Sequence, residues 1–212
     1  LEQGTDPSPI PGLWHRRNGE TVSGPPVEII APLDAMPIPD RGLLDHFGWY
    51  LSPPGVLRGH FLPGVATLAT SRGCPFSCYF CSNRALGKQV RRHSVGRVME
   101  EIAYLVRDYD VRGLYFVDET FTLQPAWLEE FCEELDRRNL RLSWGCLSRI
   151  DTMEERLLAR MKRSGLYQVD IGVESGSDRI LSYYRKTYRQ KDILAAAAMI
   201  KRVGVRCFTS FI

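Results

Sequence analysis

The chain has 212 residues, of which 44% are apolar and 25% are charged, and its formal net charge at pH 7 is +3. These values describe an ordinary globular chain with one sizeable core. The longest apolar run, Ile193 to Ile200, has eight residues, and a helix that crosses a bilayer needs about 20, so we expect no membrane-spanning segment. We find no signal-peptide pattern and therefore expect a cytoplasmic, reducing location.

The beginning of the chain differs from the rest, because ten of the thirteen prolines lie in its first 54 residues and apolar runs are few there. We expect residues 1–60 to form a Pro-rich arm or linker and residues 61–212 to form the main domain. Within the arm, Asn18-Gly19 suits the positive φ angles of a type I′ turn. The turn predicts a short exposed hairpin from two flanking segments, residues 13–17 and 20–23.

From Val65 onward, short apolar runs alternate with amphipathic segments. The runs predict strands at residues 65–69, 113–117, 142–146, 168–173 and 205–212. Apolar side chains recur at helical spacing in four intervening segments: Val98, Ile102, Leu105 and Val106; Leu128, Phe131 and Leu135; Leu157, Leu158 and Met161; and Ile193, Ala197 and Ile200. Gly165 and Gly204 are placed to end two of these helices. Such repeats imply parallel strands joined by crossovers, so the predicted fold class is α/β, a whole or partial (β/α) TIM-type barrel.

Three cysteines with CxxxCxxC spacing follow the first of these strands: Cys74, Cys78 and Cys81. Three thiolates can hold a [4Fe-4S] cluster and leave one iron open to a substrate or cofactor. Zinc is the alternative, but it takes four ligands, and the nearest conceivable fourth ones are His60 and His93. The remaining cysteines show no disulfide framework, and we interpret them as small buried hydrophobic residues: Cys132, Cys146 and Cys207.

Polar residues also follow the other predicted strands, at positions 118–120, 148–149 and 174–176. In a (β/α) barrel the chemistry gathers at the carboxyl ends of the strands. The strands themselves are apolar, so these polar groups predict one shared site at a single rim.

These residues resemble the radical S-adenosylmethionine (radical SAM) enzymes, whose CxxxCxxC motif has an aromatic residue before the third cysteine, as Phe80 does here. The resemblance runs from about Val65 to the end of the chain. A shorter segment, residues 33–40, resembles the connector before the catalytic domain in cobalamin-dependent members. The family usually closes its SAM site with a glycine motif beyond the fifth strand, so we expect this chain to be a fragment, truncated at its C-terminal end, with a cobalamin domain upstream.

The resemblance also implies roles for single residues. Asp118 or Glu119 would hold the amino group of SAM, Glu174 would accept hydrogen bonds from its ribose, and Lys186 would lie near its carboxylate. Arg149 could pair with the same carboxylate in a bidentate manner. Plainer alternatives stay open: a helix-capping role for the acidic pair at 118–119, a structural bridge from Glu174 to an arginine, and a solvated lysine at 186.

The implied function is reductive cleavage of SAM to a 5′-deoxyadenosyl radical, with a [4Fe-4S] cluster and SAM as cofactors and cobalamin bound by a domain outside this chain. The first interpretation is a cobalamin-dependent methyltransferase or a related ring-forming or rearranging enzyme. The second is a methylthiotransferase acting on tRNA, and the third is a zinc- or cluster-binding module without turnover.

The expected partners are a small-molecule substrate and a reductant such as flavodoxin or ferredoxin. Two basic clusters could suggest nucleic acid, but exposed helix faces are commonly charged and no aromatic residues interleave these clusters. We therefore expect no nucleic-acid partner. The clusters are Arg84, Lys88, Arg91 and Arg92, and Arg137, Arg138 and Arg141.

Overall fold

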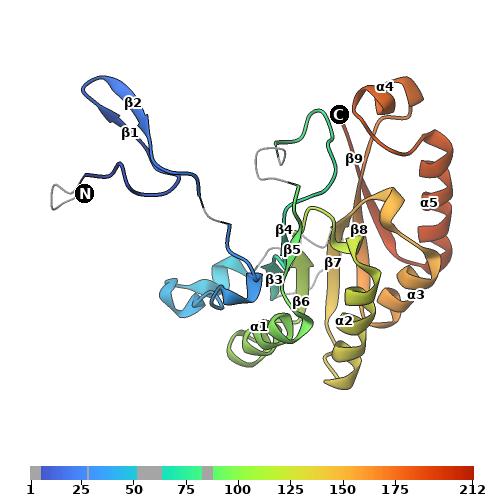
Figure 1. Cartoon of the computed structure of the whole chain (residues 1–212). Coiled ribbons are helices and arrows are strands. Elements are labelled where there is room, and N and C mark those ends of the chain that lie inside the picture. Colours follow the sequence, from blue (N-terminus) through green and yellow to red (C-terminus); the bar gives the residue numbers. More distant parts are fainter. Residues whose placement is uncertain (1–5, 28, 52–63, 83–87) are drawn as a thin grey trace. The chain divides into compact units, whose positions relative to one another are not determined.

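The computed structural model of the chain describes residues 6–27, 29–51, 64–82 and 88–212 (Figure 1). The chain divides into two compact units between Ala31 and Pro32. The predicted domain boundary at residue 60 lies outside the described residues, as do His60 and Arg84. The described residues 32–51 belong to the second unit, and the prediction of a boundary at residue 60 stays a prediction.

The segment after Pro32 joins the second unit because it packs on it. Leu33, in the 3-10 helix η1 (Leu33–Ala35), is only 2% exposed. The neighbouring Asp34 carboxylate accepts a hydrogen bond from the backbone N–H of Ser94 at 3.0 Å and lies 3.0 Å from Nδ1 of His93. Two further 3-10 helices follow, η2 (Arg41–Leu43) and η3 (Phe47–Tyr50).

The first unit contains the predicted hairpin. Strands β1 (Trp14–Arg17) and β2 (Glu20–Ser23) pair in antiparallel fashion, with Arg17 opposite Glu20. Asn18 and Gly19 have φ angles of 52° and 84°, as a type I′ turn requires. The hairpin prediction is therefore confirmed.

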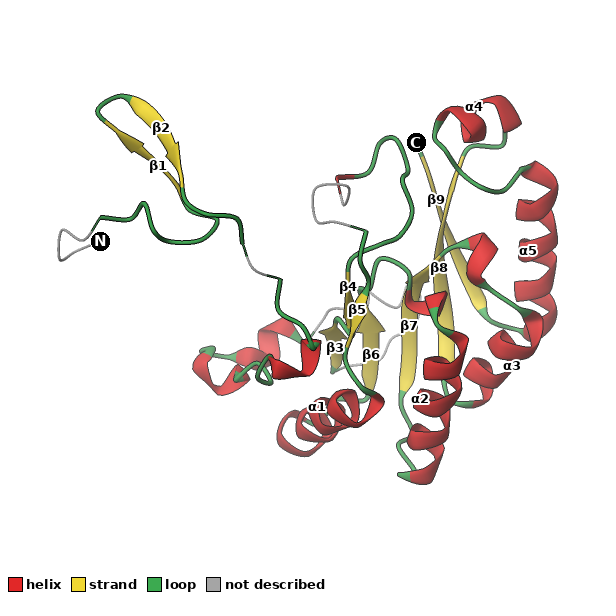
Figure 2. Cartoon of the chain, viewed as in Figure 1, coloured by secondary structure: helices red, strands yellow, loops and turns green. Residues whose placement is uncertain are grey.

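The second unit is built on a five-stranded, fully parallel sheet in the order β3-β6-β7-β8-β9 (Figure 2). Its strand order follows the chain, which is the arrangement of a partial (β/α) barrel. All five predicted strands are confirmed, each to within two residues at either end. Their bounds are β3 (Val65–Leu68), β6 (Gly113–Phe116), β7 (Ser143–Ser148), β8 (Leu166–Glu174) and β9 (Arg206–Phe211).

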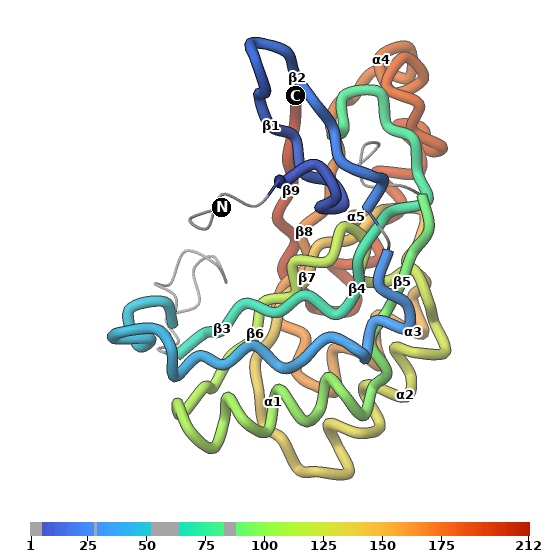
Figure 3. The backbone as a smooth tube through the Cα atoms, turned by 60° about the vertical axis from the view of Figure 1, so that its left-hand side comes forward, coloured from blue at the N-terminus to red at the C-terminus, as the bar shows by residue number. Residues whose placement is uncertain are grey.

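The four predicted helices link consecutive strands and lie along one side of the curved sheet (Figures 1 and 3). Ser94 caps the first of them by accepting a hydrogen bond from the backbone N–H of Arg97. The last ends at Gly204, whose φ of 74° is left-handed. The bounds are α1 (Val95–Tyr109), α2 (Pro125–Arg137), α3 (Glu155–Arg163) and α5 (Gln190–Val203).

The short elements of the second unit were not predicted, because they are too brief to show a periodic pattern. The helix α4 (Asp178–Tyr183) follows β8, and two-residue strands β4 (Ser71–Arg72) and β5 (Arg91–Arg92) pair in antiparallel fashion. The β4–β5 pair joins the two ends of the segment that contains the cysteine motif.

The core lies between the sheet and its helices. Alternate residues of β6 point to opposite faces: Leu114 and Phe116 are fully buried in the helix-facing core, whereas Tyr115 packs in a separate small cluster on the other face. The helix-facing core is centred on aromatic rings that pack edge-on or stacked with centroids 4.5–5.9 Å apart: Phe116, Phe121, Phe131 and Trp144. This core holds the strand ends in fixed register for a site at the rim.

Two inward-facing predictions were wrong. On α5, Ala196 is buried and Ala197 is exposed, because a run of four alanines has no periodic signal to fix the phase of the helix. Cys207 is exposed, because β9 is the last strand of the sheet and is covered on few sides. Cys132 and Cys146 are fully buried, as predicted.

Among the described residues, no helix combines the length and the apolar character that crossing a membrane would require.

Candidate active site

A pocket of about 490 Å³ opens at the carboxyl ends of the parallel strands. Its volume falls in the range of small-molecule sites. The cysteine loop forms one wall, and residues from β8 and β9 and from the segments after β6, β7 and β8 form the others. Predicted site residues among its lining are Cys74, Cys78, Phe80, Cys81, Glu119, Arg149, Glu174 and Lys186. These residues, which we predicted to share one rim of the sheet, therefore line the same pocket.

The cysteine loop is attached to the short helix α4. The backbone N–H of Tyr79 donates to the carbonyl of Tyr184 at 3.1 Å, and the ring of Phe80 packs edge-on against Tyr184 with centroids 5.1 Å apart. Inside the loop, the N–H of Cys81 donates to the carbonyl of Cys78 at 3.2 Å, which closes a turn between two of the cysteines. The unpredicted helix α4 therefore positions the motif.

All three motif cysteines carry free thiols. Cys78 is buried, whereas Cys74 and Cys81 are half-buried at the pocket wall. In the part of the chain that the structure describes, no three histidine, cysteine, aspartate or glutamate side chains converge tightly enough to enclose a metal ion. The chemistry of the donor set, three thiols of one loop beside one pocket, fits a cluster that three cysteines hold.

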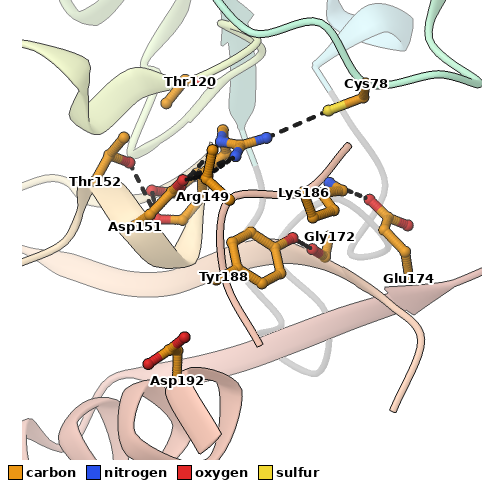
Figure 4. A network of polar contacts seen from close by, with 12 residues as sticks. Cys78, Thr120, Arg149, Asp151, Thr152, Gly172, Glu174, Lys186, Tyr188 and Asp192 are labelled. Carbon is orange, nitrogen blue, oxygen red and sulfur yellow. Dashed lines mark hydrogen bonds and ion pairs between the residues drawn. The ribbon is translucent and has the colours of Figure 1, made fainter. Parts of the chain in front are cut away.

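Arg149 lies next to Cys78 in the pocket wall (Figure 4). Its Nη1 donates to Sγ of Cys78 at 3.3 Å, and its Nε and Nη2 donate to the two carboxylate oxygens of Asp151 at 3.0 and 2.9 Å. Nη2 also donates to the hydroxyl of Thr187 at 3.1 Å. Burial alone would lower the pKa of Arg149, but the hydrogen bonds and charge of Asp151 outweigh it and raise that pKa. Asp151 therefore occupies the Nε/Nη2 edge of the guanidinium, which could otherwise bind a carboxylate in a bidentate manner.

Glu174 and Lys186 form a buried ion pair at the same rim, with Nζ of Lys186 2.9 Å from Oε1 of Glu174 (Figure 4). Their side chains are 9% and 5% exposed, so Lys186 is not the solvated lysine of the plainer alternative. Burial by itself would lower the pKa of Lys186, but the hydrogen bond that its ammonium donates to Glu174 and the nearby acidic groups raise that pKa. Gly172 makes room for the pair, because a Cβ there would lie 2.2 Å from Oε1 of Glu174.

The two acidic candidates after β6, Asp118 and Glu119, lie in different surroundings. Glu119 is half-buried and lines the pocket. Asp118 is fully buried and is not among the pocket residues; it accepts hydrogen bonds from the N–H of Thr70 at 3.0 Å, from its hydroxyl at 2.7 Å, and from the hydroxyl of Ser71. The structure thus brings Glu119 to the site and uses Asp118 to tie the base of the cysteine loop to the end of β6.

Arg92 reinforces this connection. Its guanidinium lies over the ring of Trp127, 4.6 Å from the centroid, and Nη2 donates to the carbonyl of Phe121 at 3.0 Å. Burial lowers its pKa, and the charge of Asp118 partly opposes that effect. Arg92 is therefore engaged inside the protein, in contrast to the solvated basic cluster to which we assigned it.

The sequence analysis missed several residues in or next to the pocket. Asp151 and Thr187 do not line it but anchor Arg149, and the ring of Phe76 lies against the Arg149 guanidinium. Asp170 lines the pocket from the middle of β8 and accepts a hydrogen bond from the hydroxyl of Tyr115 at 2.6 Å. The only available signal was spacing: Asp151 follows Arg149 by two residues, and Asp170 is a charged residue within an apolar strand.

The candidate zinc ligand His93 does not line this pocket; its Nδ1 faces Asp34, as described above.

Comparison with known proteins identifies the family. The profile described as the Radical SAM superfamily matches residues 68–212. The chain belongs to the radical SAM superfamily. Members of this family use a [4Fe-4S] cluster and SAM, which agrees with the three free cysteines at the pocket wall.

Two curated relatives match nearly all of the chain. An uncharacterised methyltransferase of Pyrococcus horikoshii is 34% identical over 213 residues, which cover 100% of this chain and 44% of that protein. The anaerobic magnesium-protoporphyrin IX monomethyl ester cyclase of Rubrivivax gelatinosus is 31% identical over 199 residues, covering 92% of this chain and 34% of the cyclase. The chain therefore spans less than half the length of these relatives.

A solved structure confirms the fold. The cobalamin-dependent SAM radical enzyme OxsB, with aqua-cobalamin and SAM bound, superposes with a TM-score of 0.79 at 20% sequence identity. The match covers 100% of this chain and 30% of OxsB. The parallel five-stranded sheet is thus the partial barrel of radical SAM enzymes.

Proposed function

We propose that the protein is a cobalamin-dependent radical SAM methyltransferase whose pocket binds a [4Fe-4S] cluster and SAM. The observation that carries the proposal is the convergence of three free cysteines, a buried lysine–glutamate pair and a second carboxylate on one pocket at the carboxyl rim of a parallel sheet. The name of the Pyrococcus relative and the cobalamin in OxsB support the finer assignment.

The cluster would be held by Cys74, Cys78 and Cys81, and when bound it supplies the electron that cleaves SAM. Phe80 would separate the cluster from solvent, since its ring lines the pocket and packs against Tyr184. The apolar part of the pocket excludes water from a reactive radical, which is the main task of the protein in such chemistry.

The residues around the pocket match the polar groups of SAM. Glu119 offers a carboxylate to the amino group, and the ammonium of Lys186 offers a cation to the carboxylate. Glu174 has a second oxygen, Oε2, for a ribose hydroxyl, because Oε1 is the one that Lys186 contacts. Arg149 and Asp118 are not assigned to SAM, because their polar atoms are engaged with Asp151, Cys78, Thr70 and Ser71.

The further partners of the proposal are a small-molecule substrate, a one-electron reductant such as flavodoxin or ferredoxin, and cobalamin bound by a domain outside this chain. Nucleic acid is not among them: of the basic clusters, Arg137 and Arg138 form ion pairs with Glu134 at 2.7 and 3.0 Å. The shared carboxylate reduces the positive potential that these two arginines present to a phosphate backbone.

The first test is anaerobic reconstitution of the protein with iron and sulfide, followed by electron paramagnetic resonance of the dithionite-reduced sample with and without SAM. Wild type should give a reduced [4Fe-4S] signal that changes when SAM is added, and Cys78→Ala should lose it. The matched control is Cys132→Ala, a fully buried cysteine away from the pocket, which should keep the signal. Tightly bound zinc with no iron signal would instead support a structural metal module.

A second test separates the candidate reactions, and the similarity to the Rubrivivax cyclase makes it necessary. The full-length protein is incubated with SAM, hydroxocobalamin and a reductant that generates cob(I)alamin, which accepts the methyl group of SAM, and the SAM-derived products are quantified by mass spectrometry. A methyltransferase of this kind should form both 5′-deoxyadenosine and S-adenosylhomocysteine. A cyclase should form 5′-deoxyadenosine without S-adenosylhomocysteine, and a methylthiotransferase should require a tRNA acceptor.

A further inference from the structure

The contacts of Arg149 single it out from the other cations of the pocket. Its Nη1 donates to Sγ of Cys78 at 3.3 Å, and its guanidinium carbon lies 3.6 Å from the ring centroid of Phe76 (Figure 4 shows the bond to Cys78). Phe76 lies between Cys74 and Cys78 in the motif itself. Arg149 therefore touches the cysteine loop twice, once through a sulfur and once through an aromatic face.

The other side of the guanidinium is fixed by groups outside the loop. Asp151 takes both Nε and Nη2, and Thr187 takes Nη2 as well and also donates to Asp151. The guanidinium carbon also lies 5.5 Å from the ring centroid of Tyr188. This arrangement connects the segment after β7, the segment before α5 and the cysteine loop through one side chain.

Arg149 carries its charge where water screens it weakly, since its side chain is only 8% exposed. The neighbouring carboxylate of Asp151 neutralises one edge of the guanidinium, whereas the Nη1 edge faces sulfur. A fixed cation beside a cluster sulfur favours the state with one more electron, because that state is more negative. Hydrogen bonds to cluster sulfurs and local net charge are among the factors that set the reduction potentials of iron–sulfur clusters.

We propose that Arg149 is a positioning residue that fixes the Cys78 thiolate and raises the reduction potential of the cluster bound by Cys74, Cys78 and Cys81. This inference rests on the proposed function, because it requires that the cluster forms. It differs from the role implied by family resemblance, in which Arg149 binds the carboxylate of SAM. That role requires two adjacent N–H donors, but Asp151 holds the Nε/Nη2 edge, and on the Nη1/Nη2 edge Nη2 also donates to Thr187 and Nη1 to Cys78.

The test is an anaerobic redox titration of the reconstituted full-length protein without SAM, with the reduced cluster measured by electron paramagnetic resonance at each poised potential. The variants are Arg149→Lys, which keeps a charge, Arg149→Gln, which keeps N–H donors without charge, and Arg149→Met, which keeps neither. The control is Arg112→Met, an exposed arginine paired with Asp110, which leaves the pocket unchanged.

We expect the glutamine and methionine variants to shift the midpoint to more negative potential, with at least a tenfold lower ratio of reduced to oxidised cluster at a fixed potential; for one electron, tenfold corresponds to 59 mV. The lysine and Arg112→Met variants should stay within threefold of wild type. An unchanged midpoint for glutamine and methionine overturns the inference, as does a lysine midpoint as low as that of glutamine. If the methionine variant fails to fold, the difference between the midpoints of the lysine and glutamine variants still tests the role of the Arg149 charge.

The wild-type sample separates this inference from the function on which it rests. A wild type that forms no [4Fe-4S] cluster contradicts the proposed function. A wild type that forms the cluster and binds SAM, with variants of unchanged midpoint, leaves the function intact and contradicts only the role of Arg149.

Discussion

The contrast between the neighbours Asp118 and Glu119 gives the sharpest test of the structure. Asp118→Ala removes the acceptor of three hydrogen bonds, from the backbone N–H and hydroxyl of Thr70 and the hydroxyl of Ser71, at a site that is 0% exposed. A hydrogen bond to a charged group contributes about 1.5–3 kcal/mol, and an abandoned buried donor costs about 1–3 kcal/mol. The hydroxyls can rotate toward other acceptors, so we expect a total loss of about 3–5 kcal/mol rather than the full sum.

A second cost acts in the same direction. Arg92 is largely buried, and its pKa is lowered mainly by that burial while the Asp118 charge supports the cation. Without Asp118, Arg92 loses that support. We therefore place the expected loss for alanine at the upper end of the range and expect Asp118→Asn, which keeps one acceptor oxygen, to lose less.

Urea unfolding followed by far-ultraviolet circular dichroism measures the effect. With an m value of about 3 kcal/mol per molar urea, a loss of about 5 kcal/mol for Asp118→Ala should lower the midpoint by about 1.7 M. The matched control is Glu119→Ala, which truncates a half-buried pocket residue and should change the stability by less than about 1 kcal/mol. Equal stabilities of the two alanine variants would refute the assignment of Asp118 to the loop base.

The remaining predictions concern charge and thiol chemistry. Lys186→Met should destabilise the protein by about 3 kcal/mol because it leaves the Glu174 carboxylate buried without its partner, and adding Glu174→Gln should restore part of that loss in urea unfolding; a strictly additive double variant would contradict the pairing. The pKa of Glu134 is lowered to about 2 from 4.5, first by the hydrogen bonds that it accepts from Arg137 and Arg138 at the end of α2, so its contribution to the free energy of unfolding is present above pH 4.5 and is lost as the pH falls toward 2. Carbon-13 NMR titration should show that pKa move toward 4.5 in high salt, and a salt-independent value would contradict the ion-pair origin. Burial raises the pKa of Cys132 to about 11, so iodoacetamide at pH 8 should alkylate half-buried Cys81 well before Cys132, as peptide mass spectrometry can check.

The sequence predicted the scaffold well, because its signals are strong and local. Each central strand is a short apolar run between turn residues, and helices such as α1 and α3 repeat apolar residues at helical spacing. The hydrophobic pattern failed where it did not show which side of a helix faces the core, or where the segment was too short to show a repeat. Four successive alanines could not show that Ala196 rather than Ala197 faces inward, and the six residues of α4 gave no periodic signal.

The sequence predicted which residues lie at the candidate site, but not which side chains pair with one another. Position after a strand was enough to bring Glu119, Arg149 and Glu174 to one rim. Which partner each side chain takes depends on directions that sequence order does not fix, so the structural bridge of Glu174 runs to Lys186 instead of to an arginine. Likewise, adjacent residues at a strand end point apart, and only the loop geometry shows that Asp118 turns inward and Glu119 faces the pocket.

The charges around the pocket follow one rule that bears on SAM binding. The buried cations each have a carboxylate partner, Arg149 with Asp151 and Lys186 with Glu174, so neither buried cation is left unpaired before SAM arrives. The amino acid part of SAM carries one positive and one negative group, so its entry as proposed would exchange partners within an existing ion pair, and the sulfonium group alone would add net charge. The Lys186–Glu174 pair can share its donors in this way because a lysine ammonium has three N–H groups. Arg149 cannot share its donors with SAM in this way, because Asp151 holds its Nε/Nη2 edge. Its proposed role is therefore at the cysteine loop.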